Sequence, residues 1–135
     1  MQYFALRILV VDDTPSYLST FSEILANENH EIIVAADGMS GWDRFSHDKP
    51  DLVLLDVNMP GMDGLELTSK IRASEINATS KQPWVPVILM SANASLATQL
   101  KGYRAGCDDF LNKPLEPDIL LAKIAVYQRI IRKIK

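Results

Sequence analysis

The sequence predicts an α/β domain in which a parallel, doubly wound sheet carries helices on both faces. Short apolar runs alternate along the chain with longer amphipathic segments, which is typical of repeated strand–helix units. Two of these runs, residues 52–55 and 87–90, are apolar without interruption, as expected of central strands that helices cover on both sides. The length of 135 residues fits one domain with a single core.

Five strands and five helices are expected to follow one another along the chain. Each expected strand is a short apolar run, and these runs cover residues 7–11, 31–35, 52–56, 87–91 and 109–112. The expected helices fill the intervals between them and cover residues 15–28, 38–47, 64–74, 95–105 and 117–135.

Local signals mark the ends of several of these helices. Thr14 and Pro15 suit the start of the first helix, because the fixed backbone angle of proline fits the first turn after a capping residue. Residues 58–64 are dense in turn formers and separate the third strand from its helix. Gly106 stands where the fourth helix should end in a left-handed conformation, and Pro117 suits the start of the fifth.

The stretch from Ser74 to Pro86 is long and polar for a link between a helix and a strand. We therefore expect a surface loop there, with Trp84 packed back onto the domain at its end. His30 and His47 lie in unrelated segments, which favours surface positions over ligation or catalysis.

The composition indicates a soluble globular protein, with 47% hydrophobic and 23% charged residues. A formal net charge of −3 gives no electrostatic reason to expect nucleic-acid binding. The lone Cys107 excludes an intramolecular disulfide and is expected to be a small buried apolar residue. No apolar stretch is long enough to cross a membrane, and Asp12 and Asp13 interrupt the one candidate core of a signal peptide, so a cytoplasmic location is expected by default.

Polar side chains stand at the ends of four of the expected strands. Asp12 and Asp13 follow the first strand, Asp56 ends the third, Ser91 ends the fourth and Lys113 follows the fifth. Because the carboxyl ends of parallel strands meet at one edge of the sheet, we expect these groups to lie together at the edge where open α/β sheets bind ligands.

A divalent metal ion would resolve the charge repulsion in such a cluster. Three converging carboxylates are costly unless they are neutralised, and Mg²⁺ prefers oxygen ligands of this kind. Together with Lys113, the ion brings the formal charge to zero. An aspartate can also attack phosphorus to form an aspartyl-phosphate, and Asp56, alone at the end of a central apolar strand, is the best candidate nucleophile.

The residues at these strand ends give the chain a family resemblance. It resembles the receiver domain of two-component response regulators over residues 5–127. The matching features are Val-Val-Asp-Asp at the end of the first strand, Leu-Leu-Asp-Val-Asn-Met-Pro-Gly-Met-Asp-Gly around Asp56, Met-Ser-Ala after the fourth strand, and Lys113-Pro114 after the fifth. The resemblance implies a flavodoxin-like (βα)5 fold with strand order 2-1-3-4-5.

The resemblance also implies a function in phosphorelay signal transduction. Asp56 would accept a phosphoryl group from a phosphohistidine on a sensor histidine kinase or a histidine phosphotransfer protein. Mg²⁺ (or Mn²⁺) would be bound by Asp12, Asp13, Asp56 and the backbone carbonyl of Asn58, with Asp12 acting mainly through water. Ser91 and Lys113 would stabilise the phosphoryl group.

Further roles follow from the resemblance alone. Ser91 and Phe110 would form the conformational switch, and Phe110 lacks the hydroxyl of the tyrosine that many receivers carry there. A cis peptide before Pro114 would hold the preceding lysine in place. Asn58 and Asn93 would influence how fast the acyl phosphate hydrolyses.

The last helix suggests an extension beyond the receiver. We expect the receiver to occupy residues 1–128, and residues 129–135 to extend the last helix, as a truncated linker to an output domain beyond residue 135 or as a solvated basic end. A heptad pattern runs through the helix, and its members are Leu120, Ile124, Tyr127, Ile131 and Ile134. Ile130, Ile131 and Ile134 fall beyond the usual end of a receiver and are expected to have less to bury against. The fourth helix, fifth strand and fifth helix are the expected output surface and the site of a homodimer.

Two other functions compete with a phospho-accepting receiver, which would catalyse only its own phosphorylation and dephosphorylation. One is an Mg²⁺-dependent phosphatase with an aspartate nucleophile, similar to the haloacid dehalogenases. Against it, Asn58 stands two residues after Asp56, where that class needs a carboxylate as general acid, and no segment could form a cap over a substrate. The other is a degenerate receiver used only for docking, which the complete set of site residues disfavours.

Overall fold

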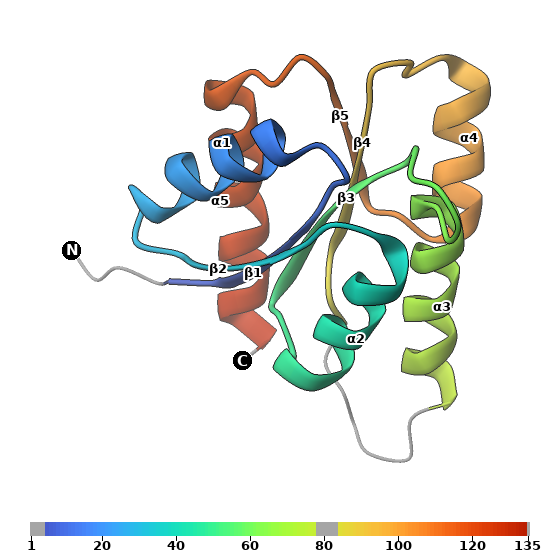
Figure 1. Ribbon diagram of the computed structural model, residues 1–135. Coiled ribbons are helices and arrows are strands. Elements are labelled where there is room, and N and C mark those ends of the chain that lie inside the picture. Colours follow the sequence, from blue (N-terminus) through green and yellow to red (C-terminus); the bar gives the residue numbers. More distant parts are fainter. Residues whose placement is uncertain (1–4, 78–83, 135) are drawn as a thin grey trace.

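The computed structural model describes residues 5–77 and 84–134 and confirms the predicted α/β architecture (Figure 1). Its five strands are parallel and follow the order β2-β1-β3-β4-β5 across one sheet. The strands are β1 (Arg7–Val11), β2 (Glu31–Ala35), β3 (Leu52–Asp56), β4 (Val87–Ser91) and β5 (Asp109–Asn112). The helices are α1 (Pro15–Ala26), α2 (Gly38–Asp48), α3 (Gly64–Asn77), α4 (Leu96–Ala105) and α5 (Pro117–Ile134).

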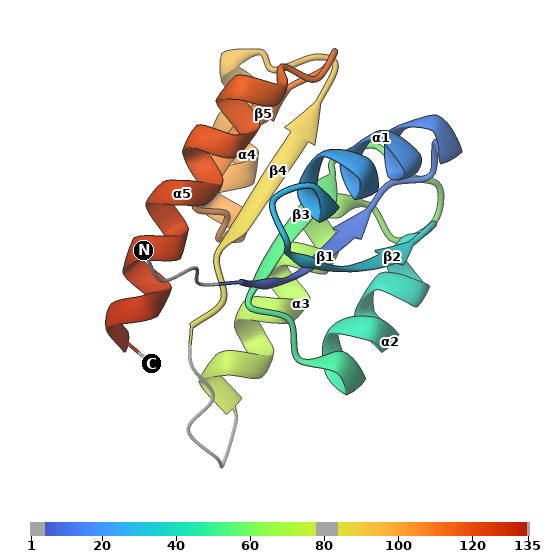
Figure 2. The same ribbon diagram turned by 90° about the vertical axis from the view of Figure 1, so that its left-hand side faces the viewer.

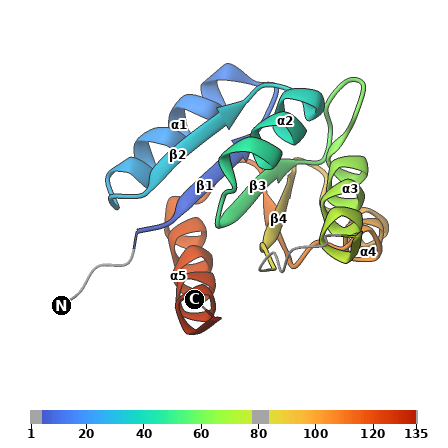
Figure 3. The same ribbon diagram turned by 90° about the horizontal axis from the view of Figure 1, so that it is seen from below.

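Helices cover both faces of the sheet, as the continuous apolar runs predict. Helices α1 and α5 lie on one face, and α2, α3 and α4 lie on the other (Figures 2 and 3). Successive side chains of a strand point to opposite faces, so β1 contributes Ile8 and Val10 to the core under α1 and α5, and Leu9 and Val11 to the core under the other helices. Strands β3 and β4 are buried at every residue. The strand ends that carry the polar residues are thereby held on a rigid, fully packed support.

The predicted helix boundaries differ from the structure mainly at α3. This helix extends to Asn77, so the first part of the expected loop is helical. Arg72 and Glu75 form an ion pair of 2.8 Å along the helix, and Arg72 also donates to Asp108 at 2.6 Å, which stabilises these last turns. Residues 78–83 of the expected loop lie outside the described residues. Trp84 does pack back onto the core beside α5.

One predicted surface position is wrong, and one residue of the last helix is more deeply buried than expected. His30 is only 7% exposed. Its Nδ1 accepts a hydrogen bond of 3.0 Å from the backbone N–H of Leu6, so the polar ring is hydrogen-bonded although it is buried. Ile131, expected to have less to bury against than the earlier part of its helix, is only 2% exposed and belongs to the core under α1 and α5. This core therefore reaches further along α5 than the expected receiver boundary at residue 128.

The other local predictions agree with the structure. Gly106 has a φ of 113° and ends α4 in the left-handed conformation, and Pro117 begins α5. Thr14 is the N-cap residue before Pro15, but its side chain makes no capping hydrogen bond. Cys107 is buried, and burial raises the pKa of its thiol to about 11. Within the described part of the chain, no helix combines the length and apolar character needed to span a membrane.

Candidate phosphoryl and metal site

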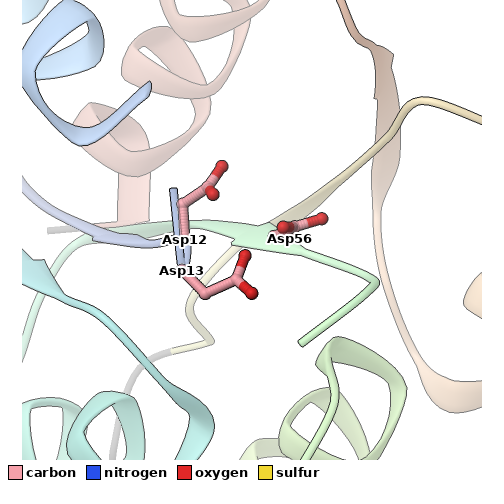
Figure 4. A group of neighbouring side chains, drawn as sticks. All are labelled: Asp12, Asp13 and Asp56. Atoms are coloured by element: carbon pink, nitrogen blue, oxygen red, sulfur yellow. The ribbon is translucent and has the colours of Figure 1, made fainter. Parts of the chain in front are cut away.

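Three aspartates meet at the carboxyl edge of the sheet. Asp12 and Asp13 directly follow β1, and Asp56 is the last residue of the neighbouring parallel strand β3. One carboxylate oxygen from each lies within 4.8 Å of the others, and Figure 4 shows Asp56 on its own strand beside Asp12 and Asp13. Asp12 and Asp56 are buried, whereas Asp13 is exposed to solvent.

Lys113 supplies positive charge to this cluster. It follows β5, and its Nζ lies 2.6 Å from Oδ2 of Asp12 and 3.3 Å from Oδ2 of Asp56. The lysine side chain is only 9% exposed. Three carboxylates against one ammonium leave an excess of negative charge at the sheet edge.

Burial and charge act together on the pKa values of this site. Burial is the largest cause that raises the pKa of Asp56, Asp12 adds to the rise, and the ammonium of Lys113 opposes it. For Lys113, burial acts to lower the pKa, but the hydrogen bond to Asp12 and the charge of Asp56 outweigh it and raise the pKa. Lys113 is thus held in its charged form.

The donor set suits a hard divalent cation. All three candidate ligands are carboxylates, the type that Mg²⁺ binds with waters completing its octahedron. Oδ1 of Asp12 accepts the backbone N–H of Thr14 at 2.9 Å, and Oδ2 accepts from Lys113. The contacts of the Asp56 oxygens are longer, 3.2 Å from the Asn58 N–H and 3.3 Å from Lys113 Nζ, so Asp56 would give up an oxygen to a metal ion more readily than Asp12.

The turn after β3 is shaped around Asp56. The backbone N–H of Asn58 donates to Oδ1 of Asp56 at 3.2 Å. A Cβ at Gly64 would lie 2.3 Å from the backbone oxygen of Asp56, so only glycine lets α3 begin so close to the strand end. Gly38 is similar, since a Cβ there would lie 2.3 Å from the carbonyl oxygen of Met62. The turn-former density of residues 58–64 predicted a turn, but not these close backbone approaches.

Ser91 ends β4, and its hydroxyl is engaged locally. Ser91 is fully buried. Its Oγ donates to the backbone carbonyl of Asn93 and accepts from the backbone N–H of the same residue, each at 3.0 Å. Asn93 itself is exposed, as is Asn58. The Ser91 hydroxyl is therefore tied to the loop after β4 in this conformation.

Phe110 lies on β5 between the sheet and α4. It is half-buried against the core under α2, α3 and α4, and its ring centroid lies 6.3 Å from that of Tyr103. A Cβ at Gly102 would lie 2.6 Å from the Phe110 ring, so this glycine makes the space that the ring occupies. Further along the chain, the peptide bond between Lys113 and Pro114 is cis, the geometry that the resemblance implies.

Fold and site together define a class of protein. A five-stranded sheet of order 2-1-3-4-5 with an acidic cluster and a buried lysine at its carboxyl edge is the architecture of flavodoxin-like signalling domains. The family model described as "Response regulator receiver domain" matches residues 8–125, and the chain belongs to this family. It is a signalling fold of two-component systems and not a member of a classical enzyme family.

Several known proteins are similar to this chain. The transcriptional regulatory protein TcrA of Mycobacterium tuberculosis is 32% identical over 123 residues, which is 91% of this chain and 46% of TcrA. The DNA-binding response regulator MtrA of Mycolicibacterium smegmatis is 33% identical over 118 residues, covering 87% of this chain and 48% of MtrA. The chain thus spans about half the length of the curated relatives it matches.

Solved structures agree with the observed fold. A CheY-like response regulator receiver domain protein from Methanospirillum hungatei superposes with a TM-score of 0.85 at 30% identity, covering 98% of this chain and all of the other. The chemotaxis protein CheY4 of Vibrio cholerae superposes with a TM-score of 0.83 at 26% identity, covering 92% of this chain and 99% of CheY4.

Proposed function

We propose that this domain receives a phosphoryl group on Asp56 from a phosphohistidine of a sensor histidine kinase or histidine phosphotransfer protein. One observation carries the proposal: a buried carboxylate at the end of a central strand lies within reach of two further carboxylates and 3.3 Å from a buried ammonium. Family membership supports it independently.

The transfer is a displacement at phosphorus. A carboxylate oxygen of Asp56 forms a bond to phosphorus while the bond from phosphorus to the imidazole nitrogen breaks, and its electron pair stays on the imidazole. Lys113 compensates negative charge on the phosphoryl oxygens through its ammonium. Asp12 holds Lys113 in place through the 2.6 Å hydrogen bond. The surrounding apolar strands keep bulk water from the buried side of Asp56.

Mg²⁺ or Mn²⁺ would be held by Asp13, Asp56, the backbone carbonyl of Asn58 and, through water, Asp12. When bound, the ion neutralises the carboxylates and the charge on the transferring phosphoryl group. Asn58 and Asn93 are exposed beside the site, where their side chains could meet water attacking the acyl phosphate, so we assign them the tuning of its lifetime.

The output depends on a conformational switch. Phosphorylation places a new acceptor near Ser91, whose hydroxyl now bonds to the backbone of Asn93. Turning that hydroxyl toward the phosphoryl group would release the loop after β4 and let Phe110 repack between β5 and α4. Because Phe110 has no hydroxyl, packing alone would drive its movement.

The surface of α4, β5 and α5 is the proposed output face and the site of a homodimer. Its support is a set of apolar side chains that are at least 39% exposed, namely Leu96, Leu100, Tyr103, Ile119, Val126 and Ile130.

The relatives are about twice as long as this chain, and one is described as DNA-binding. We therefore propose that the receiver, expected over residues 1–128, shares its core with the next turn of α5 through Ile131, and that residues 129–135 lead to an output domain. Sedimentation with and without beryllofluoride tests the homodimer, and an unchanged monomer would contradict it.

A phosphorylation assay tests the central proposal. The protein is incubated with acetyl phosphate and Mg²⁺, and intact mass is measured. Wild type should gain one phosphoryl group, and Asp56→Asn should gain none. Asp43→Asn, which removes an exposed carboxylate on α2, is the matched control and should behave as wild type. If Asp56→Asn is phosphorylated as fully as wild type, the assignment is wrong, and steady turnover of small phosphomonoesters would support a phosphatase instead.

A further inference from the structure

Tyr17 presents its aromatic face to the ammonium of Lys113. The residue lies in the first turn of α1, which Pro15 begins, and Lys113 Nζ is 4.1 Å from the centroid of its ring. This separation is well within the range of cation–π attraction. The ring is itself supported, because it packs against the core under α1 and α5 and its centroid lies 6.2 Å from that of Phe21.

The ring completes the enclosure of the ammonium. Lys113 has two charged partners, Asp12 at 2.6 Å and Asp56 at 3.3 Å, and the electron-rich face of Tyr17 lies against it as a third neighbour. A lysine side chain is a flexible stem with considerable rotamer freedom. Two contacts at its tip therefore still allow the ammonium to move out of the site. With the ring in place, only 9% of the side chain reaches solvent.

We propose that Tyr17 is a positioning residue for phosphoryl transfer, which acts by holding the Lys113 ammonium beside Asp56. This inference rests on the proposed function, because the benefit is realised when a phosphoryl group on Asp56 needs a positive charge already in place. The attraction comes from the face of the ring, so phenylalanine should replace tyrosine. Leucine fills similar apolar space without that face and should not.

The first measurement is the mobility of the lysine side chain. The order of the Lys113 ε-methylene can be read from NMR relaxation in the unphosphorylated protein. This group should be equally ordered in wild type and Tyr17→Phe and more mobile in Tyr17→Leu. A residue that merely filled space would leave the order of this methylene the same in all three proteins.

The second measurement is the rate constant of phosphorylation by acetyl phosphate in saturating Mg²⁺. In this reaction Asp56 forms the new bond to phosphorus and acetate departs with the electron pair of the old one. Tyr17→Leu should react about 5- to 30-fold more slowly, which expresses as a rate the cation–π energies of largely desolvated sites, and Tyr17→Phe should remain within about twofold of wild type. Urea unfolding of each variant establishes that it is folded.

The outcomes separate the two proposals. If Tyr17→Leu is phosphorylated as fast as wild type, or if Tyr17→Phe is as slow as Tyr17→Leu, the positioning role is refuted. If wild type itself gains no phosphoryl group, the proposed function fails. The NMR measurement still decides in that case whether Tyr17 holds Lys113, because it requires no reaction.

Discussion

The charge cluster predicts that Asp56→Asn stabilises the protein in the absence of divalent cations. At an effective dielectric constant of about 20, the 3.3 Å separation from Lys113 gives an attraction of about 5 kcal/mol, and a separation of at most 4.8 Å from Asp12 gives a repulsion of at least about 3.5 kcal/mol. Asp13 is exposed, and at the dielectric constant of water it adds about 1 kcal/mol of repulsion. The charge interactions of Asp56 therefore nearly cancel.

The desolvation of Asp56 then decides whether Asp56→Asn raises or lowers the free energy of unfolding. Burying an ionised carboxylate costs several kcal/mol, and this side chain is only 7% exposed. Asparagine removes the charge at nearly constant size, and Lys113 keeps its 2.6 Å partner Asp12, so no ammonium is left unpaired. We expect the free energy of unfolding to rise by about 1–2 kcal/mol at pH 7 in EDTA, after allowing for imperfect hydrogen bonding of the amide.

Urea denaturation followed by tryptophan fluorescence and circular dichroism measures this difference. Mg²⁺ at ten times its dissociation constant should then stabilise wild type by about 1.4 kcal/mol and should stabilise Asp56→Asn much less. The control Asp43→Asn should lie within about 0.5 kcal/mol of wild type under both conditions. A loss of stability for Asp56→Asn in EDTA would refute the account of the site as an electrostatically strained cluster.

Three further predictions concern residues around the site and the core. Burial lowers the pKa of His30 below its ordinary value of 6.5, so the folded state binds fewer protons than the unfolded chain, and stability should fall as the pH drops below about 6.5. His30→Asn, which can still accept the Leu6 N–H, should flatten this dependence in urea titrations between pH 7.5 and 5, and an unchanged slope would count against it. The Cys107 thiol, with a pKa of about 11 and 7% exposure, should react with a disulfide reagent at pH 8 far more slowly in the native than in the unfolded protein; equal rates would contradict its burial. Gly102→Ala would place a methyl group 2.6 Å from the Phe110 ring and should lower the free energy of unfolding by about 1–3 kcal/mol, whereas a more stable variant in urea would show that the ring yields freely.

The sequence predicted a residue's position correctly where that position follows from the local pattern of its own segment. The strand ends at Asp56 and Ser91 could be placed because continuous apolar runs end there, and parallel strands bring such ends to one edge. Gly106 could be placed because its left-handed backbone is a local requirement. These predictions need no knowledge of what lies across the fold.

Predictions failed where a distant contact decides the outcome. His30 is buried because the backbone of Leu6, 24 residues earlier, donates to its ring. Ile131 belongs to the predicted heptad pattern, but the pattern does not show how far along α5 the core that β1 and β3 also line extends. Tyr17 was not recognised as part of the site, because an aromatic residue in the first turn of an amphipathic helix looks like an ordinary core residue. In each case the deciding partner belongs to another element.

Lys113 takes part both in contacts between distant elements of the fold and in the proposed chemistry at Asp56. It binds Asp12, 101 residues away in the sequence, more closely than it binds Asp56. A phosphoryl group on Asp56 would add charged oxygens on the more distant side, so the attraction on the ammonium would shift from Asp12 toward the phosphorylated aspartate. The Tyr17 ring keeps the ammonium close enough for that shift to require only a small movement. Ser91, by contrast, must give up the hydrogen bond that it donates to the Asn93 carbonyl before it can donate to a phosphoryl group. On this argument the lysine responds first and the loop after β4 sets the barrier of the switch.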